Sequence, residues 1–239
     1  MKEGKLKELK SELRKEENKK RAKILSKFFK TGKGEYGEGD IFLGIKVPVQ
    51  RKIAERYNLD LEDIQELLNS KIHEFRSVGL FLLIKKFKES DEEEKENIFN
   101  FYLKNSRQIN NWDLVDLSAN KIIGEFLLGK EREVLYNLAD SENLWERRIS
   151  VISCFSFIKE NDFRDALNIS EILIKDRQDL INKAVGWMLR EIGKRNQDVL
   201  VEFLNKNYKV MPRVMLRYAT EKFDEDKRKF YLGKIAGFK

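Results

Sequence analysis

Apolar side chains recur every three or four residues through most of this 239-residue chain, a spacing that places them on one face of an α-helix. Only two prolines, Pro48 and Pro212, interrupt the pattern, and four glycines gather within residues 32–39. We therefore predict an all-α protein. Its helices are expected at residues 48–57, 61–69, 72–88, 92–103, 111–127, 131–139, 144–159, 163–175, 178–194, 197–206, 211–222 and 225–235.

The first 47 residues differ from the rest of the chain. Leucines spaced among lysines and glutamates predict one long amphipathic helix at residues 1–30, which would serve either as a DNA arm or as a solvated cap. Residues 31–47 are expected to form a glycine-rich loop, whose apolar run lacks a strand partner and ends as an extended segment or a helical turn. With helical repeats at 48–239, we expect one domain over 1–239.

The predicted helices come in pairs, and the second helix of each pair begins with a related segment every thirty-odd residues. These segments begin at His73, Asn111, Leu144, Ile181 and Met211. Such a period is typical of an α-solenoid built from HEAT-like helix pairs. We therefore expect a superhelix in which the second helix of each pair lines the concave face.

The charge of the chain changes this picture. Its net charge is +7, which favours a polyanionic partner, because contacts with phosphates release condensed counterions. Basic residues occupy similar positions in successive inner helices and predict a concave basic groove that follows a DNA backbone. They are Arg76, Arg147, Arg148, Lys183, Arg190, Arg213 and Arg217. The alternative is that these residues form ordinary ion pairs on solvated helix faces.

Several other chemistries are disfavoured. The single cysteine, Cys154, lies in an apolar run and is expected to be a core residue in a reducing compartment. The single histidine, His73, stands beside Glu74 and Arg76, which suggests packing or capping and not a catalytic triad. Zinc-type ligand clusters and a long apolar membrane segment are absent from the sequence, so we expect no metal, no cofactor and no membrane span.

Two of the three tryptophans have neighbours that indicate a cleft. Trp112 and Asp116 are four residues apart, so they share one face of a helix. Gly186 precedes Trp187 and leaves room for a close approach at that position. Burial in the core is the ordinary fate of a tryptophan and remains the alternative for each of them, Trp145 included.

Four ordered motifs give the chain a resemblance to a known family. Residues 28–48, 111–116, 144–148 and 183–191 resemble the AlkD-like DNA alkylation repair enzymes, and the likeness extends over about residues 25–223. The resemblance implies a HEAT-like solenoid around duplex DNA and metal-free excision of cationic bases such as N3-methyladenine and N7-methylguanine. It places the catalytic carboxylate on Asp116, the site tryptophans on Trp112 and Trp187, and the site arginine on Arg148.

These implications lead to a functional hypothesis. We expect a monofunctional DNA glycosylase that acts as a cytoplasmic monomer on alkylated double-stranded DNA, as in bacteria or archaea. DNA contacts are expected from Tyr36, Lys46, Arg147, Lys183, Arg190, Arg213 and Arg217. The glycine-rich loop resembles a separate branch of the family, and some branches bind DNA without excision. A non-catalytic DNA-binding protein of the same fold, or a protein-binding HEAT scaffold, is therefore the alternative.

Overall fold

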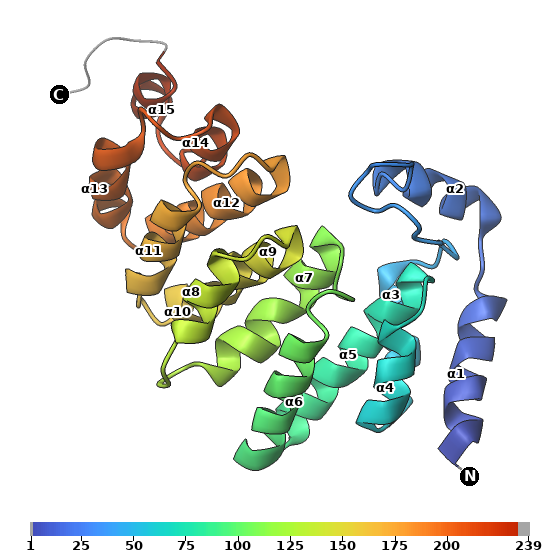
Figure 1. Cartoon of the computed structure of the whole chain (residues 1–239). Coiled ribbons are helices and arrows are strands. Elements are labelled where there is room, and N and C mark those ends of the chain that lie inside the picture. The colour runs from blue at the N-terminus through green and yellow to red at the C-terminus, as the bar shows by residue number, and fades with distance from the viewer. Residues whose placement is uncertain (1, 234–239) are drawn as a thin grey trace. The chain divides into compact units, whose positions relative to one another are not determined.

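The structure is a computed structural model that describes residues 2–233, with side chains from residue 4 onward (Figure 1). Within this part every regular element is helical, and the single β-bridge pairs Ile41 with Ile72. The prediction of an all-α protein is therefore confirmed. Residues 1 and 234–239 lie outside the described residues. They include both ends of the predicted 1–239 domain and the last two residues of the predicted helix at 225–235. None of the described helices is both long and apolar enough to cross a membrane.

The chain forms two compact units, Met1–Ser118 and Ala119–Lys239. The organisation of the whole chain as one domain stays a prediction. In unit 1, helix α5 is buried along most of its length, and helices α3, α4 and α6 pack against it, while α1 packs against α3. The helices of this unit are α1 (Lys2–Lys15), α2 (Lys19–Phe28), α3 (Val47–Glu55), α4 (Leu61–Leu68), α5 (His73–Glu89), α6 (Glu92–Lys104) and α7 (Trp112–Ala119).

The N-terminal region contains two helices, so the prediction of one helix at 1–30 is wrong. Helix α1 ends at Lys15, and Asn18 begins the second helix as its N-cap. The Asn18 side chain accepts a hydrogen bond from the Arg21 N–H at 2.9 Å. Helix α1 packs against the unit through one apolar face, and its role as a DNA arm or as a solvated cap stays a prediction. Its leucines are buried against the unit, and the Lys10 ammonium lies 2.5 Å from the Glu66 carboxylate.

The segment after the glycine-rich turns is extended and is held by a buried carboxylate. Glu74, at the start of α5, accepts hydrogen bonds from the backbone N–H groups of Leu43, Gly44 and Ile45 at 2.9, 2.7 and 3.2 Å. Gly44 has a φ of 83°, and a Cβ atom there would lie 2.3 Å from the Asn18 carbonyl oxygen. A side chain at this position is therefore excluded by both strain and space.

Unit 2 repeats one packing pattern along the chain. The π-helix η1, α9, α12 and α14 contact one another in chain order, while α8 packs on α9, and α11 and α13 pack on α12. Contacts between neighbouring pairs are typical of helical repeats. The elements are η1 (Asn120–Gly124), α8 (Glu133–Ala139), α9 (Leu144–Ser153), α10 (Phe155–Lys159), α11 (Arg164–Ile172), α12 (Asp179–Arg195), α13 (Gln197–Asn207), α14 (Arg213–Ala219) and α15 (Glu225–Tyr231).

The helices predicted from residue 48 onward agree with those observed, with differences of a few residues at their ends. Two of them are interrupted. The predicted helix at 111–127 changes to a π-helical turn at η1, and the predicted helix at 144–159 is divided at Cys154, which is buried as expected. Gly186 allows the close approach of α14, because a Cβ atom there would lie 2.6 Å from both the Met215 carbonyl oxygen and the Tyr218 Cβ.

Candidate functional site

Trp112 and Asp116 lie one turn apart on α7, as their spacing predicts, and both are half-buried. Tyr102 of α6 holds α7 in place, because its hydroxyl group is hydrogen-bonded to the Ser118 hydroxyl at 2.8 Å. Burial raises the pKa of Tyr102 above its ordinary value, and the negative charge of Asp116 acts in the same direction. Tyr102 is therefore a neutral neighbour of the Asp116 carboxylate.

Aromatic rings fix the indole of Trp112. Phe29 stacks against it with ring centroids 5.2 Å apart and planes inclined by 23°, and Phe28 meets it edge-on at 6.0 Å. Phe29 in turn stacks on Phe42 at 5.1 Å, and Phe42 stacks on His73 at 4.5 Å. Offset ring pairs of this kind contribute about 0.5–1.5 kcal/mol each beyond their burial. The glycine-rich loop thus supplies part of the support for Trp112.

A buried polar network lies next to these rings. His73 uses both ring nitrogens: Nε2 lies 2.8 Å from the Asp113 carboxylate and Nδ1 lies 3.3 Å from the Asp40 carboxylate. Arg76 donates to Asp40 at 2.7 Å and to the Ser70 carbonyl oxygen at 2.8 Å. Since Asp113 follows Trp112 directly, this network joins α7 to α5 and to the loop. The prediction that His73 serves packing or capping agrees with this geometry.

The charges of this network determine its protonation. Burial on its own lowers the pKa of His73, but the charge of Asp113 and the hydrogen bonds with both carboxylates outweigh it, so the pKa lies above its ordinary value. Burial likewise acts to raise the pKa of Asp40, but the hydrogen bond from His73 and the charge of Arg76 hold that pKa below its ordinary value. Both shifts favour the ion pair of a protonated His73 with an ionised Asp40.

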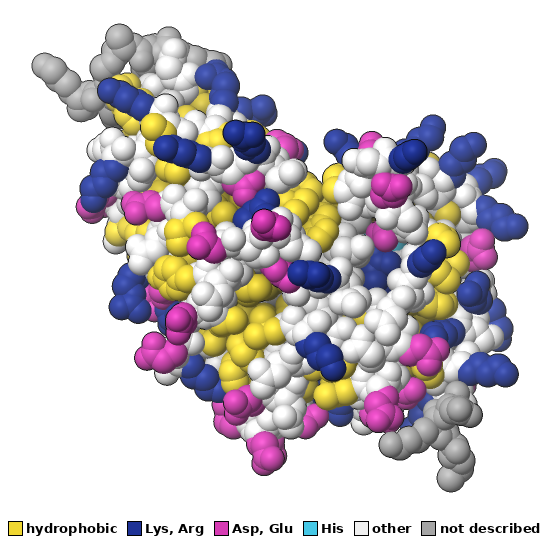
Figure 2. Space-filling model, in the orientation of Figure 1, with side chains coloured by type: hydrophobic (Ala, Val, Ile, Leu, Met, Phe, Trp, Pro, Cys, Tyr) yellow, Lys and Arg dark blue, Asp and Glu magenta, His cyan; other side chains and the backbone are white. Residues whose placement is uncertain are grey.

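Helix α2 brings positive charge close to Trp112 through residues that the sequence pattern does not single out. Its exposed lysines precede Phe28 and Phe29, the two rings that contact Trp112; they are Lys19, Lys20, Lys23 and Lys27. Figure 2 shows dark-blue side chains gathered over this part of unit 1, the region labelled α2 in Figure 1. The available signal is the run of basic residues at positions 19–23, which the leucine spacing places inside one predicted helix at 1–30.

Unit 2 contains the other two residues of the predicted catalytic set. Trp187 is half-buried on α12; its indole N–H donates to Glu191 at 3.1 Å, and its ring lies 6.2 Å from that of Phe155. Arg148 is buried on α9, with 5% of its surface exposed, and donates to the Leu180 carbonyl oxygen. Trp145 is 7% exposed and belongs to the core.

Ion pairs account for several of the basic residues assigned to a groove. Arg76 is buried with Asp40, and the Arg147 Nε lies 2.7 Å from Asp176 while its Nη1 donates to two backbone carbonyl oxygens. Lys183 lies 2.6 Å from Asp179, and Arg190 pairs with Glu221. For these four residues the ion-pair alternative agrees with the structure. The remaining predicted DNA contacts are exposed or half-buried: Lys46, Arg213 and Arg217 are exposed, and Tyr36 is half-buried.

The described residues contain no group of three or more histidine, cysteine, aspartate or glutamate side chains arranged to hold a metal ion. The chemical groups around Trp112 are a carboxylate, the indole itself and a set of fixed charges. Such an arrangement attracts a cationic, flat group, because indole faces and carboxylates both favour positive charge.

Comparisons with known proteins identify the family of the chain. Residues 9–223 match the family described as DNA alkylation repair enzyme. A predicted DNA alkylation repair enzyme from Enterococcus faecalis has a similar structure, with a TM-score of 0.67, 17% identity, and coverage of 88% of this chain and 98% of that chain. AlkD2 from Streptococcus mutans has a TM-score of 0.54, 18% identity, and coverage of 87% and 99%. No curated protein matches the chain. The family match covers most of the sequence, and the chain therefore belongs to the DNA alkylation repair enzyme family.

Proposed function

We propose that this chain is a DNA glycosylase that hydrolyses the N-glycosidic bond of cationic alkylated purines, such as N3-methyladenine and N7-methylguanine, in duplex DNA. The observation that carries the proposal is the half-buried Asp116 carboxylate one turn after Trp112, on a helix that the His73 network holds in place. It would act as a monomer on chromosomal DNA in the cytoplasm.

The proposed reaction uses the charge that alkylation places on the base. The bond between C1′ and the base nitrogen breaks, and both bonding electrons move to the base, which leaves as a neutral alkylated purine. The sugar develops oxocarbenium character, and a water molecule adds at C1′ while its proton passes to the Asp116 carboxylate and then to solvent. The products are the free base and an abasic site.

The carboxylate supplies most of the stabilisation in this scheme. Two unit charges about 4 Å apart interact by about 4 kcal/mol at an effective dielectric constant near 20. If this interaction is realised only in the transition state, it accelerates the reaction by about a thousandfold. Because the positive charge of the base already weakens the bond, a contribution of this size is sufficient for the proposal.

Other residues are assigned supporting roles in the proposal. The Trp112 indole offers its face to the cationic base. Trp187 and Arg148 have their roles from the family resemblance alone. We propose that the α2 lysines contact the phosphate backbone of DNA. The same role is proposed for the residues predicted to bind DNA, which are Tyr36, Lys46, Arg147, Lys183, Arg190, Arg213 and Arg217.

The test is the release of 7-methylguanine from methylated duplex DNA at saturating protein. Asp116→Asn removes the charge and keeps the shape, so we expect about a thousandfold slower release with unchanged DNA affinity. Asp140→Asn, which removes one exposed carboxylate at the end of α8, is the matched control and should retain the wild-type rate. Wild-type protein that binds DNA without release would favour the non-catalytic alternative, and full activity of Asp116→Asn would reject this catalytic residue.

A further inference from the structure

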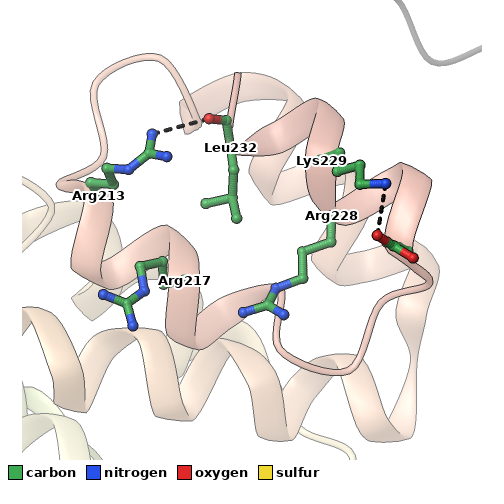
Figure 3. A pocket seen from close by; sticks show the side chains of 6 residues that line it. Arg213, Arg217, Arg228, Lys229 and Leu232 are labelled. Carbon is green, nitrogen blue, oxygen red and sulfur yellow. Dashed lines mark hydrogen bonds and ion pairs between the residues drawn. The ribbon is translucent and has the colours of Figure 1, made fainter. Parts of the chain in front are cut away.

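A pocket with a volume of about 380 Å³ lies between α14 and α15, inside unit 2 (Figure 3). Arg213 and Arg217 of α14 form one side, and Arg228 and Lys229 of α15 form the other. Figure 3 shows the Arg217 and Arg228 guanidinium groups on opposite sides of the space, with Leu232 between the two helices. The lining residues are Arg213, Arg217, Glu225, Arg228, Lys229 and Leu232.

The positive charge in this pocket is only partly compensated by protein groups. Glu225 is the single carboxylate of the lining, and it lies 2.7 Å from the Lys229 ammonium. Arg213 donates one hydrogen bond to the Leu232 carbonyl oxygen at 3.0 Å, which fixes the side chain without neutralising it. Among residues 4–233, no carboxylate forms an ion pair with Arg217 or Arg228. Three guanidinium groups therefore line the pocket with one carboxylate, Glu225, which pairs with Lys229, so the charge of the lining groups among residues 4–233 is strongly positive.

Arg228 provides the second observation. Its Nε atom is buried and finds no hydrogen-bond acceptor among the described residues. A buried donor without an acceptor is unfavourable, and for a charged group the penalty is greater than for a neutral one. An anion in the pocket would supply the missing charge and would offer an acceptor to this guanidinium group.

The geometry of the side chains indicates the kind of anion. Guanidinium groups present parallel N–H donors that match two oxygens of one phosphate, and several such groups around one space suit a tetrahedral anion better than a planar carboxylate. We propose that this pocket is a phosphate-binding site that takes one backbone phosphate of duplex DNA. The choice of DNA as the source rests on the proposed function, whereas the affinity for phosphate rests on the pocket itself.

The site extends the predicted DNA contacts from α14 to α15. Arg213 and Arg217 were predicted from their positions in the repeat, but Arg228 was not, because nothing in the segment Lys227-Arg228-Lys229 distinguishes one basic residue from its neighbours. Contacts with a phosphate fix the position of a duplex without reading its bases. The pocket would therefore hold undamaged and alkylated DNA equally well.

The experiment measures the affinity for a short undamaged duplex over a series of salt concentrations. Each phosphate contact contributes about 0.9 to the slope of log affinity against log salt concentration. We expect Arg228→Gln and Arg217→Gln each to reduce the slope by about one, with unchanged circular dichroism. Arg164→Gln, an arginine of α11 whose side chain is 78% exposed, is the matched control and should keep the wild-type slope. A wild-type slope in both pocket variants would overturn the proposal.

A second arm distinguishes a DNA phosphate from free phosphate. Inorganic phosphate is titrated against the thermal midpoints of wild-type protein and Arg228→Gln. The contrary result is that phosphate raises the thermal midpoint of the wild type only, while the wild type and both pocket variants have the same slope of log DNA affinity against log salt concentration. In that case the pocket takes a free anion, and the assignment to DNA is overturned. The slope needs no base release, so a reduced slope without 7-methylguanine release would support the pocket while rejecting the glycosylase.

Discussion

Replacing Glu74 by glutamine tests how strongly one carboxylate holds the loop beneath Trp112. In the wild type, Oε1 accepts from the N–H groups of Gly44 and Ile45, and Oε2 accepts from that of Leu43. In the variant, the glutamine carbonyl oxygen can still accept from Gly44 and Ile45, but as a neutral acceptor. Its NH₂ group then faces the Leu43 N–H, and two donors oppose each other in a site where residue 74 is only 1% exposed.

The expected loss follows from these three bonds. A hydrogen bond to a charged group contributes about 1.5–3 kcal/mol and a neutral one about 1 kcal/mol, so weakening two bonds loses about 2 kcal/mol. Leaving the buried Leu43 N–H without an acceptor adds about 1–3 kcal/mol. We therefore expect Glu74→Gln to lower the free energy of unfolding by about 3–5 kcal/mol.

Urea unfolding followed by circular dichroism gives the free energy, and amide hydrogen exchange of Leu43 and Gly44 locates the loss. Glu38→Gln is the matched control, because Glu38 also accepts one backbone N–H in the glycine-rich loop, from Gly34 at 2.7 Å, but is exposed. It should cost less than about 1 kcal/mol. A loss of that small size for Glu74→Gln, with unchanged exchange at Leu43 and Gly44, would refute the reasoning.

Two further predictions concern a buried charge and a close contact. The pKa of His73 is higher in the folded state than in the unfolded state, where it is about 6.5. Protonated His73 therefore stabilises the fold fully below pH 6.5, and this stabilisation is lost as the pH rises through the folded-state pKa. Urea midpoints of the wild type should therefore fall across that window relative to His73→Gln, and parallel pH profiles would contradict a protonated His73. Gly186→Ala should lower stability by about 1–3 kcal/mol, since the new Cβ would lie 2.6 Å from atoms of α14. Gly4→Ala on α1, where a Cβ atom has open space, should gain up to about 1 kcal/mol by helix propensity, and equal melting temperatures for the two variants would be inconsistent with the packing argument.

The helical periodicity predicted the secondary structure well, because each amphipathic face is encoded by neighbouring residues. The break at Asn18 escaped prediction for a different reason. No proline or glycine marks it, and its N–H is satisfied by the Leu43 carbonyl oxygen at 2.8 Å, a partner distant in sequence. The π-helical turn at Asn120–Gly124 likewise depends on tertiary packing, since Ser156 donates to the Asn120 carbonyl oxygen at 2.8 Å.

The candidate site was predictable only where its residues share a helix. The spacing of Trp112 and Asp116 placed them on one face of α7, and the structure agrees. The partners of Arg147 and His73 were not predictable, because Asp176 and Asp40 lie about thirty residues from them along the chain. Charge alone could not tell a paired arginine, such as Arg147, from Arg228, which has no ion pair among residues 4–233.

The stack beneath Trp112 has a consequence for the entropy of binding. Glycine-rich segments lose more conformational freedom on ordering than most sequences. Here Phe42 and the backbone that Glu74 holds are fixed by contacts within the protein, and Phe29 lies between Phe42 and the indole. The ordering is therefore completed during folding, so it does not reduce the affinity for a ligand. A flat cationic group that reaches Trp112 meets a surface whose orientation is set in advance.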